Sequence, residues 1–407
     1  MSAAISPESI LRSRAPRLMS MPPLSLYIHI PWCLKKCPYC DFNSHELRGD
    51  SPMPESEYVA ALIRDLESMV PQVWGRKVIS IFFGGGTPSL FSAQSIDAIL
   101  AAARMLLPLE HFAEVTLEAN PGTFEAKKFA GFRAAGINRL SVGIQSFNSR
   151  HLRSLGRIHD DSEARRAIEM AQENFPNVNL DLMYALPGQT LREAQKDIET
   201  AVAYGVQHIS AYHLTLEPHT QFYRNPPPLP DDDLSAEMQI MVEQALGHGG
   251  YVNYETSAFA KPGFESRHNL NYWKFGDYLG IGAGAHGKIS FLDRIVRQVR
   301  YKQPRDYVAR MAQDLSNPDP VMQQHEIGRE DRAFEFMMNA LRLTEGFTSR
   351  IFLERTGIPI ARIQGQLDEA EQRGFITKDH ARIVPTLAGR RFLNDLLQIF
   401  LPEKREE

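Results

Sequence analysis

Cysteine is scarce in this chain of 407 residues: there are three, and all of them lie between Cys33 and Cys40. So sparse a supply excludes a disulfide framework, and an odd, tightly clustered set indicates metal ligation instead. Long apolar runs are also lacking, since none approaches the ~20 residues that a membrane-spanning helix needs. The N-terminus lacks the continuous apolar segment of a secretory signal. We therefore predict a cytoplasmic protein with no transmembrane segment.

An excess of charge of one sign is missing as well. The 45 basic and 49 acidic residues give a formal net charge of −4, which gives no reason to expect nucleic acid or an anionic membrane as a partner. The length suits one large α/β unit with a smaller appended domain. We predict a flexible leader over 1–23, a barrel core over 24–225, an extension of the barrel over 226–325 and a C-terminal helical domain over 326–407.

Strand-like and helix-like patterns alternate through the first half of the chain. Such alternation predicts an α/β fold with a parallel sheet and right-handed crossovers, either a partial or full barrel or an open doubly wound sheet. In both cases the loops that leave the carboxyl ends of the strands form the functional face. The predicted strands are Leu24–Ile30, Val78–Phe83, Glu114–Glu118, Arg139–Ile144, Val178–Met183 and His208–Leu214. The helical patterns between and after them cover about 54–70, 92–107, 124–135, 162–172, 191–204 and 234–246.

The last part of the chain has a different pattern. Residues from about Glu330 to Gln398 read as short helices with a small hairpin, which predicts a winged-helix-like domain. Its mildly charged surface gives no reason to expect DNA binding.

The three cysteines follow directly on the first predicted strand, as Cys33-Leu-Lys-Lys-Cys37-Pro-Tyr-Cys40. Three thiolates on one short loop can each bind a corner iron of a [4Fe–4S] cubane, which leaves the fourth iron open to a small chelating molecule. The alternative is a structural zinc site of the Cys₃His type, with His29 or His45 as the fourth ligand.

A glycine run, Gly84-Gly-Gly-Thr-Pro88, follows the second predicted strand. Glycines let backbone amides and carbonyls come close to a ligand, although a glycine run at a strand end is more often only a turn. Further polar candidates lie at or just beyond later strands: Glu118, Gln145, Arg157 and Asp181. A carboxylate can hold ribose hydroxyls, and an arginine can pair with a carboxylate of a ligand.

The CxxxCxxC spacing after a first strand resembles the radical S-adenosylmethionine superfamily over about residues 27–216. The segments Tyr27–Ser44, Gly84–Pro88, Ser141–Phe147 and Asp181–Gly188 are similar to the family of oxygen-independent coproporphyrinogen III oxidase and its paralogues, the HemW-type haem chaperones. This resemblance covers nearly the whole chain after the leader. It implies an incomplete six-stranded (β/α) barrel. By the same resemblance, the residues at positions that contact S-adenosylmethionine are Tyr27, Tyr39, Gly85, Gly86, Thr87, Glu118, Gln145, Arg157 and Asp181.

Two departures separate this chain from the oxidase branch. The oxidase carries a further cysteine two residues beyond the third, where this chain has Phe42, and its N-terminal segment is longer. Both features resemble the chaperone branch and put decarboxylase activity in doubt. The resemblance therefore implies a protein that binds haem and passes it to an acceptor protein. The alternative is radical-based oxidative decarboxylation of coproporphyrinogen III.

The extension contains His268-Asn-Leu-Asn-Tyr-Trp273, which matches the HNxxYW motif associated with haem binding in the chaperone branch. A neutral imidazole is a ready axial ligand for haem iron, and aromatic rings can stack on a flat macrocycle. On general grounds a given histidine is more often a surface or hydrogen-bonded residue. If His268 is not the ligand, the candidates are His213, His219 and His286.

Overall fold

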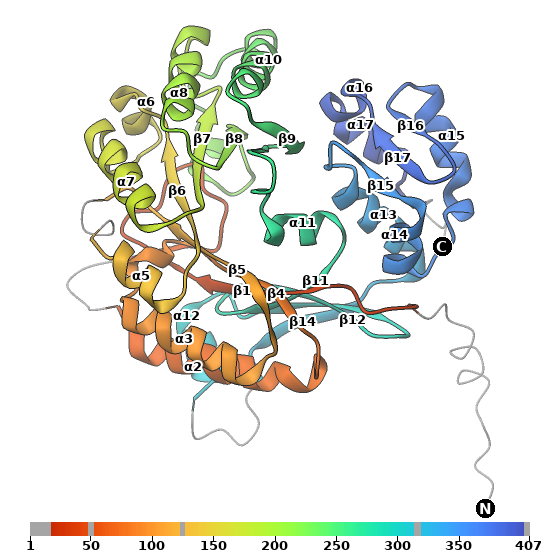
Figure 1. Cartoon of the computed structure of the whole chain (residues 1–407), viewed down its shortest axis with the longest axis horizontal. Coiled ribbons are helices and arrows are strands. Elements are labelled where there is room, and N and C mark those ends of the chain that lie inside the picture. Colours follow the sequence, from red (N-terminus) through yellow and green to blue (C-terminus); the bar gives the residue numbers. More distant parts are fainter. Residues whose placement is uncertain (1–17, 48–52, 123–126, 313–318, 403–407) are drawn as a thin grey trace, which may run out of the picture.

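A sheet of twelve strands forms the centre of the molecule in the computed structural model, which describes residues 18–47, 53–122, 127–312 and 319–402. Most of the predicted leader, residues 1–17, therefore lies outside the described residues. Six consecutive parallel strands make the middle of the sheet (Figure 1). They are β1 (Leu24–Ile30), β4 (Val78–Gly85), β5 (Leu109–Ala119), β6 (Arg139–Gln145), β7 (Val178–Tyr184) and β8 (His208–His213).

The two flanks of the sheet are built from later segments. Next to β1 lie β11 (Asp277–Ile281), which is parallel to it, and then the antiparallel strands β12 (His286–Ser290), β13 (Ile295–Arg300) and β14 (Val321–Glu326). Next to β8 lie β10 (Ala258–Ala260) and β9 (Val252–Glu255). Since β14 and β9 end the strand order without pairing, the sheet stays open, and the predicted incomplete barrel is confirmed.

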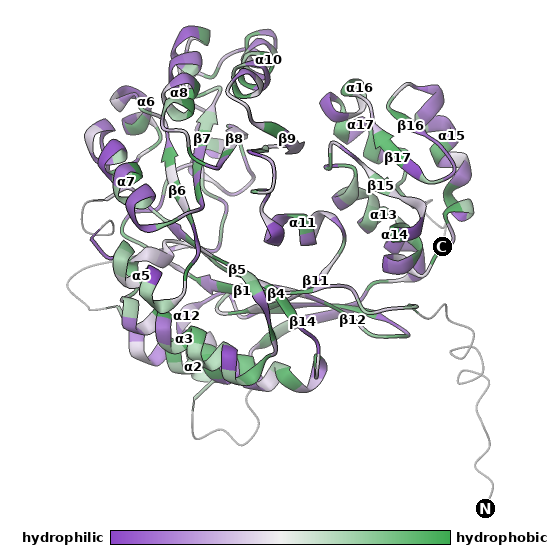
Figure 2. Cartoon of the chain, in the orientation of Figure 1, coloured by the Kyte–Doolittle hydropathy of each residue, from purple (hydrophilic) through white to green (hydrophobic). Residues whose placement is uncertain are grey.

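Amphipathic helices cover the outer face of the parallel strands, as Figure 1 shows. In α3 (Ala93–Leu106) the buried residues Ile96, Ile99, Leu100 and Ala103 recur at the spacing of one helical face, and Ser92 caps the first turn. Figure 2 shows hydrophobic residues along the strands and polar residues on the outer faces of the helices. The other covering helices are α2 (Glu55–Met69), α5 (Phe129–Ala135), α7 (Asp161–Asn174), α8 (Leu191–Ala203) and α10 (Asp232–His248).

Shorter elements complete the barrel region. They are β2 (Trp32–Cys33), β3 (His45–Glu46), α6 (Ser149–Ser154), α9 (Gln221–Arg224), α11 (Arg267–Trp273), α12 (Pro304–Arg310) and the 3₁₀ turns η1 (Val70–Gln72) and η2 (Pro88–Leu90). Two predictions of extent were inaccurate. Strand β5 begins at Leu109 rather than Glu114, and helix α5 begins at Phe129, while residues 123–126 of the predicted helix lie outside the described residues.

The C-terminal domain follows the order of elements of a winged helix. Its elements are α13 (Arg329–Ala340), β15 (Phe347–Thr348), α14 (Ser349–Thr356), η3 (Ile360–Ile363), α15 (Gln364–Gln372), β16 (Ile376–Lys378), β17 (Arg382–Pro385), α16 (Leu387–Arg391) and α17 (Leu393–Gln398). The three strands form a small antiparallel sheet beside the helices. This domain has its own hydrophobic core, which also includes Leu18, Phe275 and Ile295 from the barrel region.

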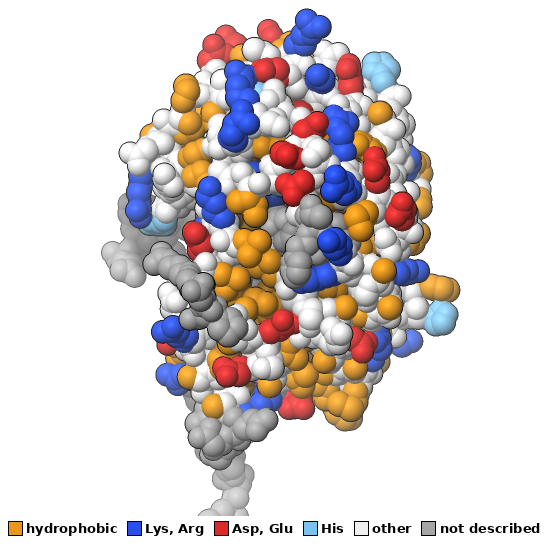
Figure 3. All heavy atoms as spheres, turned by 90° about the vertical axis from the view of Figure 1, so that its left-hand side faces the viewer, with side chains coloured by type: hydrophobic (Ala, Val, Ile, Leu, Met, Phe, Trp, Pro, Cys, Tyr) orange, Lys and Arg blue, Asp and Glu red, His pale blue; other side chains and the backbone are white. Residues whose placement is uncertain are grey.

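The surface offers no concentrated charge on the face seen in Figure 3, where basic and acidic side chains are interspersed. Within the described residues, none of the helices has the length and apolarity that crossing a membrane requires.

Candidate functional site

A cavity of about 310 Å³ opens at the carboxyl ends of the parallel strands. All three cysteines line it, together with side chains and backbone from β4, β5, β6, β7 and the end of β8. Of the nine residues that the sequence suggested for S-adenosylmethionine, eight line this cavity: Tyr39, Gly85, Gly86, Thr87, Glu118, Gln145, Arg157 and Asp181. The functional face is therefore where a parallel α/β sheet places it.

Backbone pairing and a histidine hold the cysteine loop. The amide of His45 donates to the carbonyl of Pro31 at 2.7 Å, and the amide of Leu47 donates to the carbonyl of Cys33 at 2.9 Å. Inside the loop, Nε2 of His29 lies 2.8 Å from the carbonyl oxygen of Asn43. The loop thus leaves β1 and returns to its end, which confines the three thiols to one side of the cavity.

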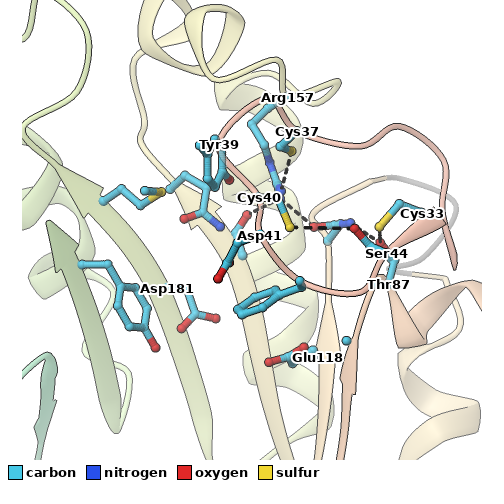
Figure 4. Close-up of a pocket in the computed structure, with 18 of the residues that line it drawn as sticks. Cys33, Cys37, Tyr39, Cys40, Asp41, Ser44, Thr87, Glu118, Arg157 and Asp181 are labelled. Atoms are coloured by element: carbon cyan, nitrogen blue, oxygen red, sulfur yellow. Dashed lines mark hydrogen bonds between the residues drawn. The ribbon is translucent and has the colours of Figure 1, made fainter. Parts of the chain in front are cut away.

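Each thiol sulfur has a different side-chain hydrogen-bond partner, as the dashed lines in Figure 4 show. Thr87 Oγ1 donates to Cys33 Sγ at 3.5 Å, and Arg157 Nη1 donates to Cys37 Sγ at 3.7 Å. Ser44 Oγ lies 3.8 Å from Cys40 Sγ. Sulfurs arranged with donors in this way are suited to carry negative charge.

Burial raises the pKa of the Cys33 and Cys40 thiols, so bare thiolates are disfavoured here. A bound cationic metal reverses this effect, because coordination deprotonates a thiol. Within the described parts of the chain, no three His, Cys, Asp or Glu side chains gather as they would around one metal ion. A cubane does not require such gathering, because each thiolate binds a different iron.

The two histidines of the zinc alternative are both engaged in hydrogen bonds. His29 is buried, and its Nδ1 lies 3.0 Å from the Tyr27 hydroxyl while its Nε2 faces Asn43. Burial, as the largest cause, lowers the pKa of His29 to about 4. Nε2 of His45 lies 3.3 Å from the carbonyl oxygen of Lys302.

The glycine run follows β4 and forms part of the wall of the cavity. Gly85 has a φ of 114°, and a Cβ at Gly86 would lie 2.5 Å from the carbonyl oxygen of Trp32. Only glycine allows the backbone to pass so close to the cysteine loop at these two positions. The close packing therefore explains why glycine is needed at these two positions, while a role of the run in binding a ligand stays a prediction.

Two carboxylates lie deeper in the barrel and face its interior (Figure 4). Burial, followed by the nearby Asp181, raises the pKa of Glu118 to about 8. Asp181 accepts hydrogen bonds from Ser141 at 2.7 Å and Asn179 at 2.9 Å, yet burial still raises its pKa. Gln145 ends β6 with a φ of 66°, an unusual backbone conformation for a residue other than glycine, and such strain is often found at functional sites.

Tyr27 and His268 do not line this cavity. The Tyr27 hydroxyl is hydrogen-bonded to His29, and burial raises its pKa. His268 is 1% exposed; its Nδ1 lies 3.0 Å from the Ser80 hydroxyl and its Nε2 lies 3.1 Å from the Tyr272 hydroxyl. Burial lowers the pKa of His268 to about 3, so the imidazole is neutral at pH 7.

Several residues of the site were missed in the sequence. Asn120 lies directly beyond β5 and contacts both Thr87 and Arg157, while Ser44 follows the last cysteine by four positions. Tyr212, which lines the cavity at the end of β8, was missed too, whereas the neighbouring His213 was expected only as an alternative haem ligand. Asn120 could have been found from its position directly beyond the end of β5. The same position near a strand end is the reason why Glu118, two residues earlier, was a candidate.

Comparison with known proteins agrees with this geometry. The family model of the radical SAM superfamily matches residues 27–201, and that of the HemN C-terminal domain matches residues 327–392. A solved structure of coproporphyrinogen III oxidase (HemN) from Escherichia coli superimposes with a TM-score of 0.78 at 22% sequence identity, covering 97% of this chain and 93% of that one. At this identity the likeness shows the fold. Fold and site thus define a radical SAM protein.

Curated relatives narrow this class. The chain is 47% identical to the haem chaperone HemW of Escherichia coli over 95% of this chain and all of that protein. It is 46% identical to HemW of Haemophilus influenzae, over 94% of this chain and 99% of that one, and 34% identical to HemW of Bacillus subtilis, over 93% and 99%. The chain belongs to the HemW family.

Proposed function

We propose that this protein binds haem and transfers it to an acceptor protein, and that it carries a [4Fe–4S] cluster with exchangeable S-adenosylmethionine. The observation that carries the proposal is similarity to HemW haem chaperones over nearly the full length of both chains. Phe42, at the position of the additional cysteine of the oxidase branch, supports the same assignment. Its side chain is 62% exposed and lines the cavity beside the three thiols.

The cluster ligands in this proposal are Cys33, Cys37 and Cys40. The residues assigned to S-adenosylmethionine follow from the family resemblance, and all of them except Tyr27 line the cavity: Tyr27, Tyr39, Gly85, Gly86, Thr87, Glu118, Gln145, Arg157 and Asp181. When bound, the cluster supplies one-electron chemistry next to the sulfonium of the cofactor. The half-buried guanidinium of Arg157 provides positive charge for a carboxylate, and the carboxyl oxygens of Glu118 and Asp181 provide acceptors for hydroxyl groups.

His268 is the proposed haem ligand, and to bind iron it must first give up one of its present hydrogen bonds. Both ring nitrogens are hydrogen-bonded inside the protein, so coordination of iron exchanges one of these bonds for the metal. Because His268 lies on the seven-residue helix α11, which ends at Trp273, we infer that this short helix shifts when haem binds. The neutral state of the imidazole meets the chemical requirement for coordination.

The test of the function is a haem titration of the anaerobically reconstituted protein, followed by its incubation with coproporphyrinogen III, S-adenosylmethionine and a reductant. We expect stoichiometric haem binding and no protoporphyrinogen. Formation of protoporphyrinogen would instead make the protein an oxidase despite Phe42.

The test of the haem ligand is the substitution His268→Ala. We expect weaker haem binding in a titration followed by Soret absorbance, with an unchanged iron–sulfur spectrum. If haem affinity stays the same, the ligand is another histidine. His213 is the first to substitute in that case, because it is exposed and lines the cavity, followed by His219 and His286.

A further inference from the structure

The hydrogen bonds to the sulfurs of Cys33 and Cys37 belong to a connected arrangement with one residue at its centre. Asn120 Nδ2 donates to Thr87 Oγ1 at 3.0 Å, and Asn120 Oδ1 accepts from Arg157 Nη2 at 2.6 Å. Thr87 and Arg157 in turn donate to the sulfurs of Cys33 and Cys37. Figure 4 shows this line of hydrogen bonds running from Arg157 across to Thr87.

The chemistry of the groups fixes the direction of each bond. A guanidinium can only donate, so the amide oxygen of Asn120 must face Arg157, and its NH₂ group must face Thr87. A hydroxyl has a single proton. Since Thr87 Oγ1 accepts from Asn120, its own proton is free to point at the sulfur of Cys33. Asn120 therefore orients two donors at once, one toward each of two cysteines.

Arg157 is further restrained from its other side. Its Nη2 also donates to the carbonyl oxygen of Gly143 at 2.8 Å, which leaves Nη1 directed at Cys37. The third sulfur, on Cys40, has Ser44 as its partner. Once Cys40 is a metal-bound thiolate it has no proton, so the Ser44 hydroxyl must be the donor.

Hydrogen bonds to the sulfurs of an iron–sulfur cluster stabilise its more negative, reduced state and so raise its reduction potential. We propose that Asn120 is a positioning residue that aims Thr87 and Arg157 at the ligands of the cluster, and that Asn120 and Ser44 together set the reduction potential. This inference rests on the cluster of the proposed function. It assigns a role to two residues that are not among the proposed contacts of S-adenosylmethionine.

Substitutions at Asn120 and Ser44 separate the contributions. Asn120→Ala removes the support of both donors. Asn120→Asp keeps an acceptor for Arg157 but cannot donate to Thr87, whose proton then turns to the new carboxylate and away from Cys33. Ser44→Ala removes the donor to Cys40, and Ser44→Thr restores a hydroxyl. Ser162→Ala is the matched control, because it deletes an exposed hydroxyl on α7 whose partner among the described residues is Asp160.

The experiment is an EPR-monitored redox titration of the reconstituted full-length protein without S-adenosylmethionine, with iron and sulfide counted for every variant. At the potential where the wild-type cluster is half reduced, we expect the ratio of reduced to oxidised cluster to fall about tenfold in Asn120→Ala, Asn120→Asp and Ser44→Ala. A tenfold change corresponds to about 59 mV for one electron. Ser44→Thr and Ser162→Ala should titrate like the wild type.

Wild-type midpoints in variants with full iron content overturn the inference. Loss of the cluster in all three variants overturns it too, because it assigns these residues to tuning and not to assembly. If Asn120→Ala alone loses iron, the other two variants carry the test. Absence of a cluster from the wild-type protein is a different result, which contradicts the proposed function itself.

Discussion

A thiolate that is shielded from water needs a nearby cation, and this requirement decides when the cysteines of the loop are ionised. Burial raises the pKa of Cys33 and of Cys40, so these two thiols are held neutral until metal binds. We predict that Cys→Ser at position 33, 37 or 40 abolishes the broad iron–sulfur absorbance, because a serine hydroxyl does not replace a thiolate at a corner iron.

Absorbance and iron content after anaerobic reconstitution check this prediction. Asp41→Asn is the control, since Asp41 adjoins Cys40 and is exposed, and it should keep the full iron content. A complete cluster in any of the three serine variants would contradict the assignment of ligands.

Because of Glu118, we expect the free energy of unfolding to fall as the pH rises. Its pKa is about 8 in the folded protein, against an ordinary value of 4.5, chiefly because of burial. The folded state therefore binds the proton more tightly than the unfolded state. The contribution of Glu118 to the free energy of unfolding is complete below about pH 4.5 and is lost as the pH rises toward 8.

Glu118→Gln keeps the shape of the side chain and removes this titration. We expect the variant to gain stability relative to the wild type between pH 5 and pH 8, by at least about 1 kcal/mol, since one pKa unit is worth about 1.4 kcal/mol. Urea unfolding at several pH values, with no cofactor added, measures the difference. If the free energy of unfolding of the two proteins changes with pH in the same way, the prediction is wrong.

Part of the site could be predicted from the sequence because Glu118, Gln145 and Asp181 lie at or near the ends of strands, whereas the full set of nine residues followed from the family resemblance. Eight of the nine residues proposed for S-adenosylmethionine meet in one cavity with the cysteines. The surroundings of His268 could not be predicted, because its partners Ser80 and Tyr272 come from a strand far away in sequence and from the next turn of its own helix. Periodicity indicates which residues share a face, but not which distant strand a helix packs on.

At the scale of elements, the turn after β11 supports the cysteine loop. Gly284 has a φ of 80°, and a Cβ there would collide with the side chain of Asn43. That amide donates to the carbonyl oxygens of Ala283 and Lys302, both at 2.9 Å. The turn after β11 and the end of the cysteine loop are therefore in close contact, with no room for a methyl group at Gly284.

We predict that Gly284→Ala lowers the free energy of unfolding by about 1–3 kcal/mol and reduces iron incorporation, because it strains the backbone and displaces Asn43. Urea unfolding and iron counting measure the two effects. Gly247→Ala is the control: this residue lies in α10 with nothing near the added methyl group, so the substitution should be neutral or stabilising. Equal effects of the two substitutions would contradict the prediction.

The six parallel strands were predicted with bounds within two residues, except for the start of β5, but the flanks of the sheet were not predicted. Strand β14, Val321–Glu326, shows exposed or half-buried side chains throughout, so it has no hydrophobic alternation to detect. It is a strand because its backbone pairs with β13. Strand β11 was also missed, since its partner β1 lies about 250 positions earlier, and such pairing leaves no local pattern.

At the scale of the whole molecule, helix α11 lies between the sheet and the C-terminal domain (Figure 1). The guanidinium of Arg342 stacks over the ring of Trp273 at 4.3 Å and also lies 3.7 Å from Glu255. Arg297 on β13 pairs with Glu335 on α13 at 2.6 Å. The motif thus contacts the C-terminal domain through Trp273 and the sheet through the bond between His268 and Ser80, so we expect movement of α11 to depend on how firmly the C-terminal domain is docked.

Phe275, two residues after that motif, is an apolar link between the two parts. It is 1% exposed, belongs to the core of the C-terminal domain and packs against Phe336 with ring centroids 5.9 Å apart. Lys288 lies over its other side at 4.1 Å. Truncating a buried phenylalanine costs about 3–5 kcal/mol, and here the cavity would open at the junction between the parts.

We therefore predict that Phe275→Ala destabilises the protein by about that amount and speeds hydrogen exchange in α11 and α13 more than in the parallel strands. Mass spectrometry of exchanged peptides measures the difference, and Phe392→Ala, at a residue of the same domain that is 56% exposed, is the control. Uniform acceleration over the whole chain would mean that sheet and C-terminal domain open as one unit. In that case the docking of the domain could not regulate α11 separately, and release of His268 for haem would require opening of the barrel itself.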